Sequence, residues 1–240
     1  ISSIIAAHLV VNKSKTIAVK LKPSGEKKLK QKHPWVFDQS ITVLKSEPNT
    51  GDVAVVFDSK SNNLLGVGLF DMESPIRIKM LGFSSMKLNS EWAMNGFKKA
   101  FETRKPFIRE DNNAYRLIYG ESDGFPGLIV DVYAGNAVMK IYSSIWKDYM
   151  ELLLDALIET IGPDSVVLRF GRSAGKSYNY QDGHILYGDL NSEVVHFIEH
   201  GVNFSANVIR GHKTGYFLDH RNNRKQIGEM SSGLTVLDVF

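Results

Sequence analysis

Arg210-Gly-His-Lys-Thr-Gly-Tyr-Phe-Leu-Asp-His-Arg-Asn-Asn-Arg224 is the stretch on which the predicted fold and function of this chain depend. Gly211 and Gly215 give the backbone the freedom to fold closely around a ligand. Asp219 is predicted to cap a helix whose first turns are residues 221–226. A loop that enters a helix presents free backbone N–H groups and a favourable dipole, which suits an anion. The alternative is a basic surface loop without a ligand.

The segment Leu234-Thr-Val-Leu-Asp-Val-Phe240 follows Gly233 and is predicted to be a buried strand with one acid, Asp238, near its end. A strand of this type commonly leads into a cofactor-binding loop at its carboxyl end. We therefore expect the chain to be the N-terminal part of a protein whose main site lies beyond residue 240. The alternative is an ordinary core strand.

The composition is that of an ordinary globular chain, with 240 residues of which 43% are hydrophobic and 23% charged. No apolar run is long enough to span a membrane, so no membrane partner is expected. The absence of cysteine excludes disulfides, thiolate metal sites and a cysteine nucleophile within these residues. It also fits a reducing compartment, and we expect a cytoplasmic protein.

Positive charge is concentrated near the N-terminus. Residues 13–32 hold eight lysines against one acid, Glu26, a local charge of +7, whereas the whole chain carries only +3. The aromatic segment His33-Pro-Trp-Val-Phe37 follows directly, and cations beside a stackable ring favour RNA binding. A solvated lysine-rich face with core aromatics is the alternative. The RNA-binding candidates are Lys20, Lys27, Lys28, Lys30, His33 and Trp35.

Two regions of secondary structure are predicted. Residues 16–83 contain short strands separated by turns, which is typical of a small β-barrel. Its predicted strands are 16–21, 52–58, 64–70 and 75–81, with a short helix at 26–31. Residues 90–207 have an α+β pattern with a helix capped by Ser90. Its predicted helices are 90–104 and 145–161, and its strands are 115–118, 128–133, 136–142, 165–170, 194–199 and 202–208.

Two motifs suggest chemistry that their context does not support. The run Gly171-Arg-Ser-Ala-Gly-Lys-Ser177 has three residues between its glycines where a phosphate loop needs four. His196 and His200 match an inverted zinc-protease pattern, but their apolar neighbours favour a strand, on which the two rings would lie roughly 13 Å apart. No metal site is expected.

Glu121 and Asp123 lie in a turn-forming segment, and structural roles are favoured for them.

Three stretches together resemble one family. They are Lys28-x-x-x-x-His33-Pro-Trp-Val-Phe37, Tyr115-Arg-Leu-Ile-Tyr-Gly-Glu-Ser-Asp-Gly-Phe-Pro-Gly-Leu-Ile-Val-Asp131 and Gly211-His-Lys-Thr-Gly-Tyr-Phe-Leu-Asp-His-Arg-Asn-Asn-Arg224. Nearly the whole chain from about Ile17 is similar to the S-adenosylmethionine-dependent methyltransferases that modify cytosine at carbon 5 in bacterial large-subunit ribosomal RNA. The resemblance implies a mixed α+β chain: a PUA-like β-barrel at 16–83, a central α+β domain at 90–207, and the first strand of a Rossmann-like methyltransferase domain within 208–240.

The resemblance also implies a cofactor, S-adenosyl-L-methionine, and a partner, ribosomal RNA. The residues that it places against the cofactor are Lys213, Thr214, Gly215, Tyr216, Leu218, His220 and Asp238. It adds Arg221 and Arg224 to the RNA-binding candidates. His220 departs from the family, which usually has Gln at this position, so the contact made by this side chain is in doubt.

The family's glycine loop and its catalytic cysteine would lie beyond residue 240. The cysteine thiolate attacks the pyrimidine ring, and this chain has no cysteine, so we expect the 240 residues alone to be inactive. A stand-alone PUA-type RNA-binding protein and a small-molecule enzyme with a basic surface are the competing interpretations. The oligomeric state is left open, a homodimer included.

Overall fold

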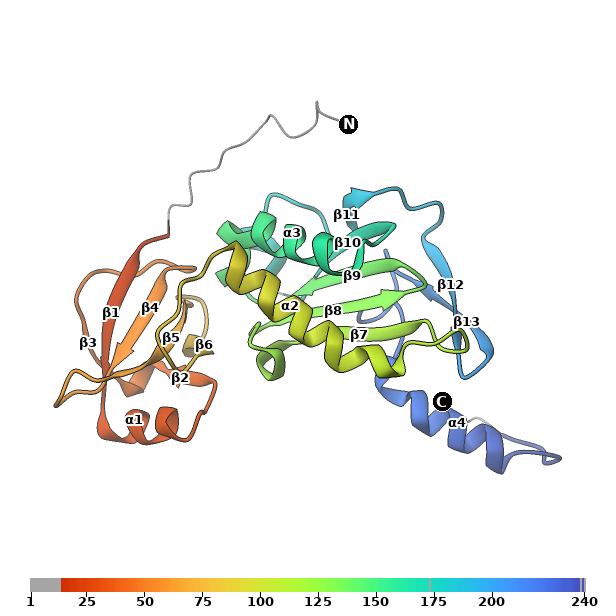
Figure 1. Ribbon diagram of the computed structural model, residues 1–240, viewed down its shortest axis with the longest axis horizontal. Coiled ribbons are helices and arrows are strands. Elements are labelled where there is room, and N and C mark those ends of the chain that lie inside the picture. Colours follow the sequence, from red (N-terminus) through yellow and green to blue (C-terminus); the bar gives the residue numbers. More distant parts are fainter. Residues whose placement is uncertain (1–13, 173, 238, 240) are drawn as a thin grey trace. The chain divides into compact units, whose positions relative to one another are not determined.

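The computed structural model describes residues 14–172, 174–237 and 239. They divide into two compact units (Figure 1). Unit 1 contains the described residues up to Lys87 together with Ser144–Leu153. Unit 2 contains the described residues of Leu88–Ser143 and of Leu154 onward.

Unit 1 is built on a curled six-stranded sheet with the strand order β2-β6-β5-β4-β1-β3. Its strands are β1 (Thr16–Leu21), β2 (Trp35–Phe37), β3 (Ile41–Leu44), β4 (Val53–Phe57), β5 (Leu64–Phe70) and β6 (Ile76–Gly82). Alternate side chains of β1 point into the core, where Ile17, Val19 and Leu21 are buried beside Phe70 and Ile78. The lysine-rich helix α1 (Pro23–Lys30) follows β1 and buries Leu29 against this core.

Helix α1 begins three residues earlier than predicted. Pro23 occupies its first turn, where a missing N–H costs nothing because that donor has no partner within a helix. Strand β3 was not predicted, because three of its four side chains are exposed and give no alternation. The four strands predicted within 16–83 are confirmed.

Unit 2 contains a five-stranded sheet with the order β11-β10-β9-β8-β7. Its strands are β7 (Ala114–Tyr119), β8 (Leu128–Tyr133), β9 (Asn136–Ile141), β10 (Ser165–Phe170) and β11 (His184–Gly188). Helix α2 (Ser90–Arg104) lies across one face of this sheet, and α3 (Met150–Ile161) has its C-terminal part in the same unit (Figure 1). A Cβ on Gly96 would lie 2.6 Å from the Phe125 ring, so this glycine lets Phe125 pack against α2 beside Phe97.

A two-stranded hairpin, β12 (Val194–Glu199) and β13 (Val202–Asn207), packs against the sheet. Phe197 and Ala206 of this hairpin join Tyr133 and Val138 of the sheet in one buried cluster. The chain then forms a loop, and the last helix or strand of the described residues is α4 (Arg221–Met230). The short 3₁₀ turns are Asp38–Ser40, Lys105–Phe107, Gly120–Asp123, Ser144–Tyr149, Ala174–Ser177 and Leu218–His220. No helix in the described part of the chain is long and apolar enough to cross a membrane.

Three predictions of local structure were wrong. Residues 234–237 form no strand, and Leu237 is 83% exposed, because no neighbouring strand in the described residues pairs with their backbone. Asp238 and Phe240 lie outside the described residues. Helix α4 is preceded by His220 as its N-cap, whereas Asp219 lies in a 3₁₀ turn. Asn89, rather than Ser90, caps α2, because its side chain accepts the Trp92 N–H at 3.0 Å.

Candidate functional site

A buried polar network joins the loop before α4 to the sheet of unit 2. The Asp131 carboxylate on β8 is fully buried and accepts hydrogen bonds from Arg116 Nε at 2.8 Å and Nη2 at 3.0 Å. The Thr214 hydroxyl donates to the same carboxylate at 2.6 Å, and the Tyr133 hydroxyl lies 2.9 Å from the Thr214 hydroxyl oxygen. Two of the sequence motifs, which are far apart in the chain, therefore meet at one carboxylate.

The network also changes the proton affinities of its members. Burial by itself lowers the pKa of Arg116, but the hydrogen bonds and charge of Asp131 outweigh burial and leave that pKa raised. Burial, and then the Asp131 charge, raises the pKa of Tyr133. Both groups therefore keep their protons, and the network holds one fixed charge pattern.

The loop that carries Thr214 is shaped by its glycine. Gly215 has φ +120°, and a Cβ there would lie 2.8 Å from the Asn207 carbonyl oxygen on β13. Lys213 also has a positive φ, of 55°, and its carbonyl oxygen accepts a hydrogen bond from Lys140 Nζ at 2.6 Å. Gly215 is thus needed both for its backbone conformation and for packing against the hairpin.

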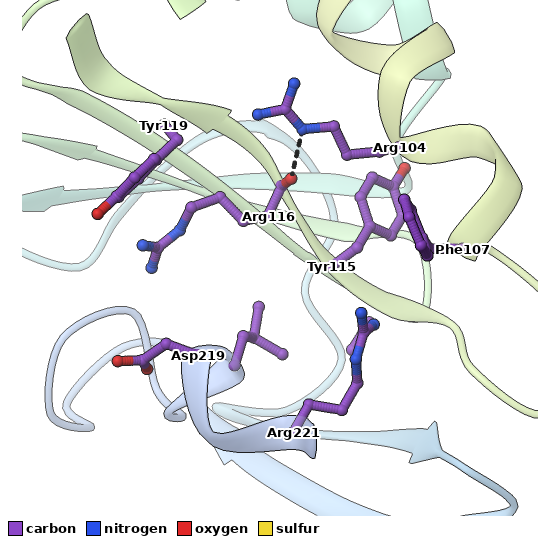
Figure 2. A pocket seen from close by; sticks show the side chains of 9 residues that line it. Arg104, Phe107, Tyr115, Arg116, Tyr119, Asp219 and Arg221 are labelled. Carbon is purple, nitrogen blue, oxygen red and sulfur yellow. Dashed lines mark hydrogen bonds between the residues drawn. The ribbon is translucent and has the colours of Figure 1, made fainter. Parts of the chain in front are cut away.

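Two hollows open beside this network, both within unit 2. Figure 2 shows the first hollow, which has a volume of about 410 Å³ and lies between β7 and the turn before α4. It is lined by Arg104, Phe107, Ala114, Tyr115, Arg116, Tyr119, Leu218, Asp219 and Arg221. The second hollow, of about 350 Å³, shares Arg116 and Tyr119 with the first. Its other lining residues are Gly120, Glu121, Gly127, Leu128, Ile129, Tyr142, Lys213 and Thr214.

The arginines of the first hollow differ in how far their charge is compensated. Arg104 makes a bidentate ion pair with Asp123, at 2.8 and 2.6 Å, and the same carboxylate accepts the Tyr119 N–H. Arg116 is held by Asp131. Within the described residues, no hydrogen bond or ion pair holds the guanidinium of Arg221. Arg221 is therefore the cation of this hollow that is available to an anionic ligand.

The predicted cofactor residues divide into two groups. Lys213, Thr214 and Leu218 line the hollows, although Thr214 is almost fully buried. Gly215 and Tyr216 face the protein interior, where the Tyr216 ring packs edge-on to Phe197 at 5.0 Å. The Tyr216 hydroxyl is buried with no hydrogen-bond partner in the described residues.

His220 is half-exposed and lies 3.9 Å from the Asp219 carboxylate. It lines neither hollow. Asp238, the remaining cofactor candidate, is not among the described residues. The structure thus brings three of the seven predicted cofactor residues, Lys213, Thr214 and Leu218, to the hollows.

Arg221 and Arg224, the two RNA-binding candidates of unit 2, have different surroundings. Arg221 lines the first hollow. Arg224 makes a bidentate ion pair with the buried Glu199, at 2.8 and 2.7 Å, and its guanidinium lies 4.4 Å from the centre of the Tyr216 ring. Arg224 therefore has a structural role that the sequence did not predict.

The RNA-binding candidates of unit 1 lie on and after α1. The exposed side chains of α1 include Lys27, Lys28 and Lys30, and Lys28 Nζ lies 5.6 Å from the centre of the Phe37 ring. The His33 ring meets Trp35 edge-on at 5.9 Å, and its Nδ1 accepts the Trp35 N–H at 3.2 Å. Lys20, on β1, is partly buried.

Several residues of the hollows were missed by the sequence analysis. Arg116 and Tyr119 lie in a quoted motif that was interpreted as a strand and a turn. The residues Phe107, Tyr119 and Tyr142 are 59%, 54% and 49% exposed, which is unusual for large aromatic residues. For Arg116 and Tyr119, the available sequence signal was a basic residue between two tyrosines in Tyr115-Arg-Leu-Ile-Tyr119.

Comparison with known proteins gives related sequences over nearly the whole chain. The profile of the PUA-like domain family matches residues 19–83. A ribosomal RNA large subunit methyltransferase from Deinococcus radiodurans is 35% identical over 234 residues, covering 93% of this chain and 57% of that protein. Ribosomal RNA large subunit methyltransferase I from Vibrio parahaemolyticus is 31% identical over 227 residues, again covering 57% of the relative.

Solved structures show the same fold. A Streptococcus mutans protein assigned as a SAM-dependent methyltransferase superposes with a TM-score of 0.74 at 19% identity, covering 88% of this chain and 53% of that one. A methyltransferase structure complexed with SAH gives the same values. The resemblance predicted from the three motifs is therefore confirmed: the chain is related over nearly its whole length to the ribosomal RNA large subunit methyltransferases and spans a little over half of theirs.

Proposed function

We propose that the chain is the RNA-binding and substrate-facing portion of a cytoplasmic SAM-dependent methyltransferase that modifies cytosine at carbon 5 in large-subunit ribosomal RNA. The observation that carries this proposal is the meeting of the family's two longest motifs at Asp131, beside two hollows that share Arg116 and Tyr119. Residues 16–83 act as a PUA-like RNA-binding domain, 90–207 as a central domain, and 208–240 as the start of the methyltransferase domain.

The described residues supply charges that fit one end of the cofactor. Lys213 and Asp219 lie at the edges of the hollows, with Lys213 Nζ 3.4 Å from the Asp219 carboxylate. The methionine end of S-adenosyl-L-methionine carries a carboxylate and an ammonium group, which complement this pair. When bound, the cofactor supplies a methyl group on a sulfonium centre. The residues here bind and orient, because no cysteine is present to activate the ring.

The surface of unit 1 supports ribosomal RNA as the partner. The lysines of α1 extend into solvent beside His33 and Trp35, and the PUA-like profile covers this region. Phosphate contacts from several lysines provide affinity that does not depend on base sequence. Ring stacking adds contacts to unpaired bases.

Mass spectrometry of large-subunit ribosomal RNA tests the proposal. A strain without the gene is expected to lack one 5-methylcytosine, and the complete gene is expected to restore it. The purified 240-residue chain is expected to bind ribosomal RNA but to transfer no methyl group from labelled S-adenosyl-L-methionine. Unchanged methylation in the deletion strain would refute the proposal, and methyl transfer by the purified chain would refute the assignment of the nucleophile.

A stand-alone PUA-type RNA-binding protein is the second candidate, and the exposed lysines of α1 favour it as much as the first. The two candidates differ in the cofactor. A methyltransferase is expected to bind S-adenosylhomocysteine in a calorimetric titration of the complete gene product, whereas a simple RNA-binding protein is not.

A further inference from the structure

We propose that the first hollow of unit 2 binds an unpaired nucleotide of the RNA, with its base stacked on Tyr119 and its phosphate at Arg221. This inference rests on the proposed function for the identity of the RNA. It assigns a second RNA contact in unit 2, made by residues of β7 and α4.

The size and lining of the hollow suit a nucleotide. Its volume of about 410 Å³ is within the range of small-molecule sites. Leu218 and Ala114 supply apolar surface, while Tyr115, Tyr119 and Phe107 supply rings. Aromatic rings stack on any base because every base has a flat π face.

Tyr119 is held ready for stacking. Tyr119 is 54% exposed, so a large part of the residue is open to solvent. The Arg116 guanidinium lies 5.3 Å from the ring centre, and Arg116 is itself fixed by the buried Asp131. A ring that is positioned before binding loses little conformational freedom when a base stacks on it.

The charges place the phosphate on one side of the hollow. In Figure 2 the guanidinium of Arg221 points towards Tyr115 and Phe107, whereas the Asp219 carboxylate lies on the side of Arg116. Asp219 repels a phosphate on its own side. Arg221 has no partner among the described residues, so its charge is available to the phosphate.

Arg116 and Arg104 are not suitable for testing this site by truncation. Removal of Arg116 would leave Asp131 buried without its cation, and removal of Arg104 would do the same to Asp123. Either change would disturb the fold. Tyr119 and Arg221 have exposed or unpaired functional groups and can be replaced without this effect.

Fluorescence anisotropy with a short labelled oligocytidine RNA tests the proposal over a series of salt concentrations. Tyr119→Ala is expected to weaken single-strand binding about tenfold, because the contact with one stacked base is lost. The salt slope should stay unchanged, because no phosphate contact is removed. Tyr119→Phe keeps the ring and should bind as the unmodified chain does. Arg221→Ala is expected to reduce the slope of log K against log salt by about 0.7.

Matched controls use the same residue types elsewhere in unit 2. Tyr187→Ala removes a ring from the edge strand β11, and Arg210→Ala removes an exposed arginine that pairs with Glu193. Both should bind within about twofold of the unmodified chain, a change far smaller than the loss of one stacked base. The series is repeated in a chain in which alanine replaces Lys27, Lys28 and Lys30, which removes the contribution of these unit 1 lysines to RNA binding.

Two results would overturn the inference: unchanged oligocytidine binding by Tyr119→Ala, or an equal loss of binding to a duplex RNA, whose bases are not free to stack. Failure of the proposed function is distinguishable. If the deletion strain keeps its methylation while Tyr119→Ala still binds weakly, only the proposed enzyme activity fails. If the methylation is lost but Tyr119→Ala binds normally, only the hollow is wrongly assigned.

Discussion

Replacement of Arg224 by alanine should destabilise unit 2 rather than act directly on RNA binding. The Arg224 guanidinium pairs with both oxygens of Glu199, at 2.8 and 2.7 Å, and also covers the Tyr216 ring. Only 2% of the Glu199 side chain is exposed. Truncation of Arg224 therefore leaves a carboxylate buried without its partner.

The magnitude follows from this burial. Breaking a buried ion pair on one side costs about 3–5 kcal/mol, and the lower figure applies because 27% of the Arg224 side chain is exposed. With a denaturant slope of about 2 kcal/mol per molar urea, a loss of about 3 kcal/mol lowers the unfolding midpoint by about 1.5 M. The double variant Glu199→Ala/Arg224→Ala should be about 2 kcal/mol more stable than the sum of the single changes predicts.

Urea denaturation followed by circular dichroism measures these differences. Arg221→Ala is the matched control, since it removes the same side chain three residues earlier on the same helix, where the described residues provide no partner. It should change the free energy of unfolding by less than about 0.5 kcal/mol. If Arg224→Ala proved as stable as Arg221→Ala, and if it lowered the salt slope of RNA binding, the structural role assigned to Arg224 would be wrong.

Three further predictions concern other parts of the chain. Gly215→Ala should lower the free energy of unfolding by about 2 kcal/mol, because φ is +120° and the new Cβ would collide with β13. The control Gly228→Ala lies in α4, where a new Cβ has nothing within 4 Å, and it should raise the free energy of unfolding by up to about 1 kcal/mol. Equal melting temperatures of the two variants would contradict this prediction. The salt slope of ribosomal RNA binding should fall by about 2 to 3 when alanine replaces Lys27, Lys28 and Lys30, and an unchanged slope in a filter-binding series would exclude the RNA role of α1. Burial raises the pKa of Tyr115 to about 12, from 10.0. The stability that the protonated Tyr115 hydroxyl contributes is therefore complete below about pH 10 and is lost as the pH rises towards about 12. The difference in unfolding free energy between the unmodified chain and Tyr115→Phe should change only in that range.

Secondary structure was predictable where side chains alternate between core and solvent. Strand β1 has this pattern, with every second residue buried, and it was predicted at its observed bounds. Strands β3 and β11 were missed because most of their side chains are exposed on both faces. Their strand conformation depends on hydrogen bonds to β1 and β10, which no local pattern reveals.

The candidate site was predictable in its segments but not in its contacts. The motif around Thr214 was singled out, and so was the motif that ends at Asp131. Their hydrogen bond joins residues 83 positions apart, and residue order carries no direct sign of it. Gly215 was predicted to allow close approach of a cofactor, but the close approach in the structure is to the Asn207 carbonyl.

Arg221 and Arg224 show why residue type alone overestimates an RNA-binding surface. Both belong to one basic motif and lie three positions apart on α4, so the sequence gives no reason to separate them. The hairpin decides the difference: it presents Glu199, from the end of β12, to Arg224 and not to Arg221. The buried Glu199 neutralises Arg224 and leaves the neighbouring Arg221 without a partner in the described residues, so the Arg221 charge is available to bind a phosphate at the first hollow.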